Sequence, residues 1–591
     1  MYYSSGNYEA FSKTRRPNNI EKKKVHIVGA GLAGLSVACF LLRDAHMSGE
    51  NINIYEKSDI LGGACDGYAY KNMGFTMRGG REMDNHFECM WDLYRSIPSI
   101  ENDNISVLDE YYWLNKKDPN FSLIRATVDR GKDANMNGKF KLSEKAKMEI
   151  MNLFFMKDEN LYDKSISGFF SNEIFESNFW LYWRTMFAFE NWHSALEVKR
   201  YLKRYIHHIG GLPDFTALRF TRYNQYESLI LPIIKYLNNN NVQIHYSSTI
   251  KDIKFNISNE SKIAEQMIVS KNGNQYTLDL SLDDYIFITN GSCVENSAFG
   301  SQNEPPQYDS NIKNDGLWSL WENIARQSPD FGNPKKFSGD VEKTNWVSAT
   351  ITTLDSKIPE YVKRISRRNP FSGETVTGGI VTIKDSNWLL SWTFNRQPQF
   401  KKQSKNQTVG WLYGLFSDIE GNFIKKRMRD CTGKEICMEW LYHLGVPIND
   451  IENFAENSAN TVPCMMPYIT SFFMPRRKSD RPLGIHDSYM NFAFIGQFAE
   501  TERDTVFTTE YSIRTAMEAV YKLFNVDRGV PEVWGSTYDL RDLINAVVKI
   551  SDGKTLYEME LLPEQKMVMD LVLNKVKDTD IEALLKEYGA I

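Results

Sequence analysis

The sequence predicts a mixed α/β fold in which a parallel sheet binds a dinucleotide. The first supporting observation is the run Gly29-Ala30-Gly31-Leu32-Ala33-Gly34, which follows the β-like segment Lys24 to Val28 and opens an apolar helix. The second is a further strand, 51–55, that ends in the acid Glu56, 22 residues after Gly34. The third is a pair of later β-like segments that each end in a glycine. Together they predict a doubly wound sheet assembled from separated parts of the chain.

The glycine run has a physical reason at each position. Gly29 permits a tight turn, Gly31 lets the backbone approach a pyrophosphate, and Gly34 lets helix and strand pack closely. Ala33 lies in the same turn, and the start of the helix offers free N–H groups to an anion. Glu56 is placed to accept from a ribose hydroxyl and disfavours a 2′-phosphate. The alternative, a glycine-rich turn without a ligand, is less favoured because strand, helix and acid occur in the required order.

Composition excludes several classes of protein. Of 591 residues, 42% are hydrophobic and 25% charged, which is typical of a globular chain, and the net charge of −5 gives no general reason to bind nucleic acid. Seven scattered cysteines without a CxxC pair predict neither a zinc site nor disulfides and indicate a reducing compartment.

Targeting signals are not evident in the sequence. The polar, basic N-terminus lacks the apolar segment of a secretory signal, so the protein is expected in the cytoplasm. The apolar stretch Val25 to Leu42 could be mistaken for a membrane span. Its glycines instead divide it into a short strand and a helix.

The chain from Lys57 to Ala64 resembles the second glycine pair of the glutathione-reductase-like and amine-oxidase-like flavoproteins. This resemblance implies FAD and a discontinuous cofactor domain. Later segments follow the order of that superfamily: a strand pair near 241–250, a strand-to-glycine turn at 285–292, and a strand, glycine and helix between 491 and 524. The residues that the resemblance assigns to FAD in these segments are Gly63, Ala64, Ile250, Ser292, Thr508 and Ser512.

A candidate catalytic loop, Met77 to Met83, contains the sequence Arg78-Gly79-Gly80-Arg81-Glu82. Its glycines would let the backbone approach a flat ring, and Glu82 could act as a general base toward water. Arg81 and Met83 are expected to contact the cofactor. A salt-bridged surface turn is the alternative that the spacing leaves open.

Five longer segments between residues 77 and 521 read MRGGREMDNHFECMWDL, RYNQYESLILPIIKYL, SWTFNRQPQF, PCMMPYITSFFMPR and NFAFIGQFAETERDTVFTTEYSIRTAMEAVY. These segments resemble the bacterial oleate hydratases, flavoproteins formerly called myosin-cross-reactive antigens. The resemblance implies that water is added across the cis double bond of a free unsaturated fatty acid, oleate giving 10-hydroxystearate. It also implies FAD without net oxidation, and a homodimer.

The resemblance assigns the catalytic roles. Glu82 activates the attacking water, and Tyr201 matches the family's proton donor. Apolar residues recur at helical spacing along 198–209, so Tyr201 is expected to face inward, where an ordinary core tyrosine is the alternative. Gly210 and Gly211 are expected to end this helix.

The substrate's two ends need different environments. The resemblance implies Thr393 and Asn395 as the anchor of the carboxylate, although both residue types also form turns. An aromatic-rich stretch could wall an acyl tunnel or simply form core: Phe175, Phe179, Trp180, Tyr182, Trp183, Phe187, Phe189 and Trp192.

The predicted organisation is an N-terminal arm, an interrupted FAD-binding domain, an inserted substrate lobe and a helical C-terminal tail. The boundaries are 1–22 for the arm, 23–90, 215–295 and 485–525 for the FAD domain, 91–214 and 296–484 for the lobe, and 526–591 for the tail. In the tail, an amphipathic helix begins at Pro563, and Thr579 with Glu582 predicts a capping box.

A peripheral membrane contact is a further expectation, since the substrate is a lipid. The tail could contact a bilayer, close over the lobe or join a dimer. Its acidic balance makes the basic cluster Arg476-Arg477-Lys478 with Arg481 the better candidate for lipid, and a solvated loop is the alternative.

Other functions stay open at this level. The same scaffold could support a redox flavoprotein of the amine oxidase or desaturase type, or a fatty-acid isomerase. A lipid-binding carrier is a different class, against which the paired Glu82 and Tyr201 argue, because a carrier needs neither.

Overall fold

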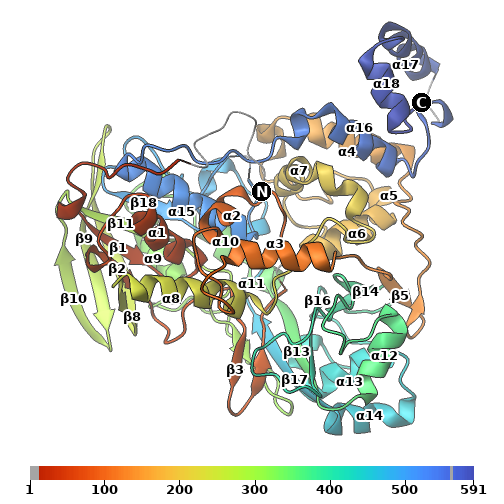
Figure 1. Cartoon of the computed structure of the whole chain (residues 1–591), viewed down its shortest axis with the longest axis horizontal. Coiled ribbons are helices and arrows are strands. Elements are labelled where there is room, and N and C mark those ends of the chain that lie inside the picture. Colours follow the sequence, from red (N-terminus) through yellow and green to blue (C-terminus); the bar gives the residue numbers. More distant parts are fainter. Residues whose placement is uncertain (1–11, 81, 503, 560–562) are drawn as a thin grey trace. The chain divides into compact units, whose positions relative to one another are not determined.

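The structure is a computed structural model that describes residues 12–80, 82–502, 504–559 and 563–591. Arg81 therefore lies outside the described residues. The chain forms two compact units (Figure 1). The first contains residues up to 134 together with 218–474 and 478–533, and the second contains 135–217, 475–477 and 534–591. The predicted division into a cofactor domain and a substrate lobe is a different partition and stays a prediction.

The first unit is built on a five-stranded parallel sheet in the order β18-β11-β1-β2-β7. Its strands are β1 (Lys24–Val28), β2 (Ile52–Tyr55), β7 (Gln243–His245), β11 (Asp284–Thr289) and β18 (Phe492–Ile495). Helix α1 (Leu32–Arg43) connects β1 to β2 and packs against α15 (Thr509–Phe524). The mixed α/β fold with a doubly wound sheet, and the division of the apolar stretch into strand and helix, are confirmed.

The opposite face of this sheet is covered by a three-stranded antiparallel sheet and a helix, β8 (Ser248–Ile257), β9 (Lys262–Lys271), β10 (Asn274–Asp279) and α9 (Leu317–Ala325). Alternate residues of the parallel strands point to this side, where Val28, Ile288 and Phe494 join Ile253 and Met267 in one core. Because both faces are buried, β18 is apolar throughout and β11 is apolar from Tyr285 to Ile288, as parallel strands usually are.

An eight-stranded sheet in the order β12-β17-β13-β16-β15-β14-β5-β6 also belongs to this unit. Its strands are β5 (Ala126–Val128), β6 (Lys132–Asp133), β12 (Ala298–Phe299), β13 (Trp346–Thr353), β14 (Val381–Ile383), β15 (Leu390–Thr393), β16 (Thr408–Gly414) and β17 (Ala459–Met466). The helices α12 (Lys357–Ser366), α13 (Gly433–His443) and α14 (Ile448–Asn457) contribute to its core.

A short hairpin leads from the first sheet to the second. It consists of β3 (Tyr68–Tyr70) and β4 (Gly74–Thr76), and β4 packs on β13 and β17. Directly after it, Met77 N donates to Thr350 Oγ1 at 2.7 Å, and Ser348 Oγ donates to Arg78 O at 2.9 Å. The candidate catalytic loop is thereby attached to β13. Further helices of this unit are α2 (Glu88–Tyr94), α3 (Val107–Lys117), α8 (Leu231–Asn239), α10 (Lys335–Ser338) and α11 (Val341–Thr344).

The second unit is helical. Its helices are α4 (Glu144–Phe155), α5 (Asn172–Phe175), α6 (Asn178–Phe187), α7 (Ala195–Arg204), α16 (Leu540–Ile550), α17 (Pro563–Val576) and α18 (Asp580–Glu587). The tail joins this unit because α16 packs on the 3-10 helix 206–211. In addition, the Asp552 carboxylate accepts from Phe140 N at 2.6 Å and from Lys141 N at 3.0 Å.

Two local predictions in this unit are wrong. The α-helix carrying Tyr201 ends at Arg204, and residues 206–211 form a 3-10 helix instead of continuing to Gly210. The capping box at Thr579 is absent because its hydroxyl donates to Val576 O at 2.5 Å, while Glu582 accepts from Asp578 N at 2.8 Å. The start of the tail helix at Pro563 is confirmed.

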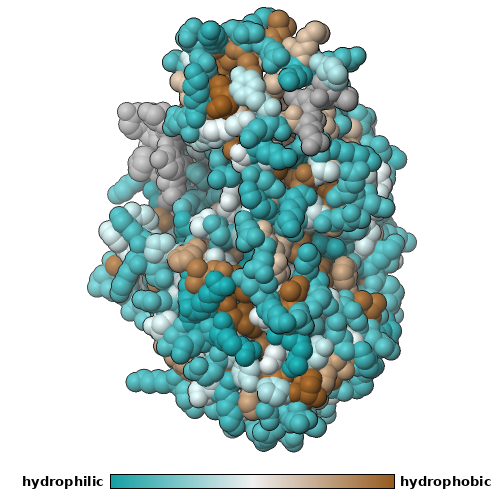
Figure 2. Space-filling view, turned by 90° about the vertical axis from the view of Figure 1, so that its right-hand side faces the viewer, coloured by the Kyte–Doolittle hydropathy of each residue, from teal (hydrophilic) through white to brown (hydrophobic). Residues whose placement is uncertain are grey.

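The tail presents apolar side chains to solvent (Figure 2). Met567 is 70% exposed, and Val568, Leu571 and Val572 are each more than half exposed. Across the residues described, no helix is both long enough and apolar enough for a membrane crossing.

The basic cluster expected at the surface is partly interior, which corrects that expectation. Arg476 and Arg481 are buried, and Arg481 donates to Phe472 O at 2.7 Å. Arg477 is exposed and Lys478 is half-buried. Because Arg476 and Arg481 are buried, their guanidinium groups are not available to a lipid headgroup. All seven cysteines are free.

Candidate active site

A cavity of about 630 Å³ opens at the carboxyl ends of the parallel strands. It lies where the sheet order reverses, with β1 between β11 and β2, which is where α/β sheets bind their ligands. Ten of the residues predicted to bind the cofactor line it: Gly29, Gly31, Ala33, Glu56, Gly63, Ala64, Ile250, Ser292, Thr508 and Ser512. Gly34 and Met83 are outside the lining.

Two glycines of this turn are constrained, Gly29 by its backbone conformation and Gly34 by close packing. Gly29 has φ +86°, a left-handed conformation that suits glycine. A Cβ on Gly34 would lie 2.1 Å from Gly29 O, so this position serves helix packing, not the cavity wall. The two predicted glycine segments meet, since Gly62 N donates to Ala30 O at 2.8 Å and a Cβ on Gly63 would lie 3.0 Å from Gly31 Cα.

Glu56 connects the second strand to this turn. Its Oε2 accepts from Ala30 N at 2.8 Å, and its Oε1 accepts from Ser58 N at 2.9 Å. Burial raises the pKa of the Glu56 carboxyl, although the backbone N–H groups of Ser58 and Ala30 oppose that rise. The acid therefore holds the turn in shape while also lining the cavity.

The lining suits a dinucleotide such as FAD. The first turns of α1 and α15 both contribute to it, and helix N-termini favour phosphate. Three buried oxygens of lining residues, Thr289 Oγ1, Glu295 Oε1 and Asn296 Oδ1, lack a hydrogen-bond partner within the described part of the chain. Buried polar atoms of this kind indicate that a ligand supplies their partners. The residues present thus fit the cofactor.

The candidate catalytic loop is joined to this cavity through Arg78. Arg78 N donates to Asp66 Oδ1 at 3.0 Å, and the Arg78 guanidinium donates to Gly63 O at 3.2 Å. Arg78 also lines the cavity, which Glu82 does not. Glu82 is half-buried, and its Oε1 lies 3.5 Å from where a Cβ on Gly80 would be.

Residues of this loop also line a second, small pocket of about 20 Å³. Gly79, Gly80, Thr393, Asn395 and Trp411 line it, so the structure brings the candidate catalytic loop and the predicted carboxylate anchor together. Thr393 Oγ1 lies 3.0 Å from Thr377 Oγ1 and 3.4 Å from Asn395 Oδ1.

Sequence reasoning missed Gln225 as a residue of this pocket. Its Nε2 donates to Gly79 O at 3.2 Å, and Tyr223 and Asn224 line the same pocket. These residues belong to the segment RYNQYESL, whose resemblance to the hydratases was the available signal.

Tyr201 lies on α7 of the second unit and is fully buried, so the prediction that it faces inward is confirmed. Its ring centroid is 4.9 Å from that of Phe187, 5.1 Å from Phe189 and 5.8 Å from Tyr205. Seven of the eight aromatic residues suggested as tunnel walls lie on or near α5 and α6, and most of them are buried. Glu82 belongs to the first unit.

The parallel sheet, its glycine turn and the cavity at its carboxyl ends define a mixed α/β fold of the Rossmann type. The sequence pattern of the MCRA family matches residues 22–521. The chain belongs to the MCRA family, and at 49% identity to a curated hydratase over its whole length it is a hydratase.

Two curated relatives and two solved structures illustrate the similarity. The oleate hydratase of Streptococcus pyogenes serotype M49 is 49% identical over 590 residues, which is 99% of each chain. The linoleate hydratase of Lactiplantibacillus plantarum is 29% identical over 540 residues, 85% of this chain and 94% of that one. Cyclohexylamine oxidase from Brevibacterium oxydans matches with a TM-score of 0.49 and 10% identity, over 85% of this chain and 99% of that chain. Putrescine oxidase matches with a TM-score of 0.47 and 11% identity over the same shares.

Proposed function

We propose that this protein adds water across the cis double bond of free unsaturated fatty acids, converting oleate to 10-hydroxystearate. The observation that carries the proposal is the match over 99% of both chains to a relative named for oleate hydration. A second relative, named for linoleate hydration, supports the same substrate class.

FAD is the proposed cofactor, and the ten predicted residues that line the large cavity would hold it. Gly34 would act through the packing of α1, and Arg81 and Met83 would act through the catalytic loop. When bound, FAD would order this loop and contribute electrostatically, without being oxidised or reduced overall.

Tyr201 and Glu82 are the proposed acid and base. An isolated alkene and water are both unreactive at neutral pH, so a proton donor and a positioned base are both required. The Tyr201 hydroxyl would give its proton to one alkene carbon while water oxygen bonds to the other. Glu82 would accept the proton that this water loses, and its negative charge would stabilise the developing cation. One C–H and one C–O bond form, and nothing is oxidised.

Thr393 and Asn395 are the proposed anchor of the substrate carboxylate. Their support is the small pocket that they share with the loop carrying Gly79 and Gly80. The aromatic residues around α6 are proposed as walls of an acyl tunnel. A homodimer, a cytoplasmic location and a peripheral membrane contact stay predictions.

Mass spectrometry of oleate treated with FAD-loaded protein in heavy-oxygen water tests the proposal. A hydratase yields a product heavier by one water, with heavy oxygen in the new hydroxyl and no hydrogen peroxide. Peroxide would indicate an oxidase, an unchanged mass with a moved double bond an isomerase, and unchanged oleate that stays bound a carrier. Each of these three results would refute the proposed function.

A further inference from the structure

Helix α2, which begins shortly after Glu82, does not cap its own N-terminus. The residue before it, Phe87, has no side-chain acceptor, although the first N–H groups of a helix need one. Cys89 N donates to Glu510 Oε1 at 3.1 Å, and Met90 N donates to Glu510 Oε2 at 2.8 Å. The cap of α2 is therefore a carboxylate from α15, more than 400 positions along the chain.

The Glu510 carboxylate is completely buried and has a counter-charge. Arg514, one turn further along α15, donates to Glu510 Oε1 at 2.9 Å and to Asp504 Oδ2 at 3.2 Å. Burial raises the pKa of Glu510 to about 7; the Arg514 guanidinium opposes this rise, and the carboxylates of Asp504 and Glu88 add to it. A buried carboxylate at this position has a desolvation cost, which the two N–H bonds and Arg514 offset in part.

The start of α2 is connected to the segment that carries Glu82. Trp91 Nε1, in the first turn of α2, donates to Asp84 O at 2.8 Å. On the other side, Met83 and Arg219 exchange two backbone hydrogen bonds of 3.0 Å each. Residues 83 and 84 are thus fixed between α2 and residue 219, and Glu82 directly precedes them.

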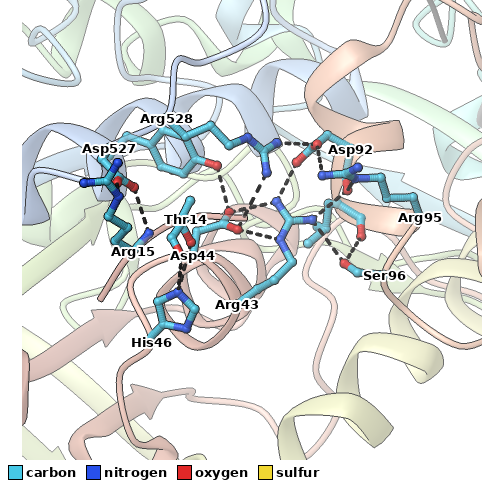
Figure 3. Close-up of polar contacts among 12 residues, drawn as sticks. Thr14, Arg15, Arg43, Asp44, His46, Asp92, Arg95, Ser96, Asp527 and Arg528 are labelled. Carbon is cyan, nitrogen blue, oxygen red and sulfur yellow. Dashed lines mark hydrogen bonds and ion pairs between the residues drawn. The ribbon is translucent and has the colours of Figure 1, made fainter. Parts of the chain in front are cut away.

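Helix α2 is also joined to both helices whose first turns line the large cavity. On α15, Thr509 lines the cavity and donates to Met90 Sδ at 3.1 Å. On α1, Arg43 binds Asp92 Oδ2 of α2 at 2.5 Å, and Arg528 pairs with the same carboxylate (Figure 3). A change in either cavity-lining helix would therefore reach the loop of Glu82 through α2.

We propose that Glu510 is a positioning residue, which fixes Glu82 relative to the cofactor cavity by capping α2 from the first turn of α15. The proposal rests on the proposed function, in which Glu82 is the base. The Glu510 side chain contacts backbone N–H groups and Arg514, and its role is to hold the base in place. Its loss should lower kcat more than it alters substrate or cofactor binding, because a displaced base affects the transition state.

The experiment compares Glu510→Gln with the matched control Glu518→Gln in FAD-loaded protein. Glu518 lies on the same helix and accepts from Thr501 Oγ1 at 2.8 Å, so its substitution removes a carboxylate without touching the cap. For E510Q we expect a kcat roughly 10- to 100-fold below wild type, with KM and FAD affinity within about twofold. For E518Q we expect a kcat within about twofold of wild type.

Hydrogen exchange supplies a measurement that does not depend on turnover. The amides of Cys89 and Met90 should exchange faster in E510Q than in wild type and should stay protected in E518Q. If E510Q does not fold, Glu510→Asp keeps the charge but shortens the reach to both amides. Faster exchange of these amides together with a lower kcat, in E510Q or in E510D, supports the proposal. An unchanged kcat despite faster exchange overturns it, and so does unchanged exchange.

Failure of the proposed function would appear in the wild-type protein, and failure of the positioning role would appear in the E510Q variant. A wild-type protein that does not hydrate oleate refutes the proposed function itself. An active wild type whose E510Q variant keeps full kcat refutes the positioning role alone. The two failures are therefore distinguishable, because one is measured in the wild type and the other in E510Q.

Discussion

Arg476 donates from Nε to Glu197 Oε1 at 2.8 Å, and both side chains are completely buried. Glu197 lies on α7, one turn before Tyr201. Removing one partner of a buried ion pair leaves an uncompensated charge, which costs about 3–5 kcal/mol. Arg476→Met should lower the free energy of unfolding of the second unit by about this amount, measured by urea denaturation followed by tryptophan fluorescence.

The neighbouring residue provides the control. Arg477 pairs with Asp163 at 2.8 Å, but these side chains are 66% and 37% exposed. Exposed pairs contribute little, so Arg477→Met should cost less than about 1 kcal/mol. Equal stability of the two variants would contradict a stabilising role for the buried pair.

His193 should make the second unit less stable in mild acid. Its ring is completely buried, and Nδ1 accepts from Glu190 N at 2.8 Å, which requires the neutral imidazole. Burial, with Arg184 adding to it, lowers the pKa of His193 well below the ordinary value of 6.5. Below about pH 6.5 the unfolded chain takes up a proton that the folded chain refuses, so stability falls as pH falls.

His193→Asn measures this contribution, because the Asn oxygen can accept the same hydrogen bond without titrating. Between about pH 7.5 and 5.5 the wild type should lose about 1.4 kcal/mol more than the variant. Urea unfolding at the two pH values gives the difference. Parallel losses in both proteins would show that His193 is protonated when folded.

The parts of the fold that could be predicted depend on local signals. Neighbouring residues predict the glycine turn at Gly29, the buried strands and the helix after Thr508. Glu56 was placed by its spacing from Gly34, because the length of a strand–helix–strand unit limits where the second strand can end.

The parts that could not be predicted depend on residues distant in sequence. Arg476 is predicted to be exposed because a run of basic residues normally is, and only the fold brings Glu197 beside it. In the sequence Glu510 is one acid of an ordinary helix, and only the fold places it against the first N–H groups of α2. At Thr579 the local rule itself fails, since the hydroxyl has a closer acceptor in Val576 O.

Gly34→Ala should weaken FAD binding, although Gly34 itself does not line the cavity. The new Cβ would lie 2.1 Å from Gly29 O and 3.0 Å from Ile27 Cγ2, so α1 must move away from β1. We expect FAD affinity, measured by fluorescence titration, to fall by at least about tenfold. The control is Gly273→Ala, at the β9–β10 turn with φ +83°, where an added Cβ would have no heavy atom of the described residues within 4 Å apart from its chain neighbours. Its FAD affinity should not change, although backbone strain lowers stability. Equal FAD affinities in the two variants would show that this glycine turn does not contribute to cofactor binding.

Thr393→Val should raise KM for oleate, because a hydrogen bond to a carboxylate contributes about 1.5–3 kcal/mol. The expected rise is roughly 10- to 100-fold with little change in kcat, and it should be smaller for the methyl ester. Thr382→Val is the control, since its hydroxyl lies 3.0 Å from Ser391 Oγ on the same pair of strands but outside the small pocket. Similar KM values for oleate in both variants would show that Thr393 does not bind the substrate carboxylate.

Glu82→Gln and Tyr201→Phe test the proposed acid and base most directly. Each substitution keeps the shape of its side chain and removes one proton-transfer group, so each should lower turnover by about 10²- to 10⁴-fold. FAD titration and binding of oleate should stay near wild type, because neither change empties a cavity. Tyr205→Phe is the matched control: its ring centroid lies 5.8 Å from that of Tyr201 in the same aromatic cluster, so the same hydroxyl is lost at a neighbouring position. If Tyr201→Phe and Glu82→Gln both kept wild-type turnover, the acid–base mechanism would be wrong even for a confirmed hydratase. If Tyr205→Phe instead lost turnover, the proton donor would be the neighbouring tyrosine.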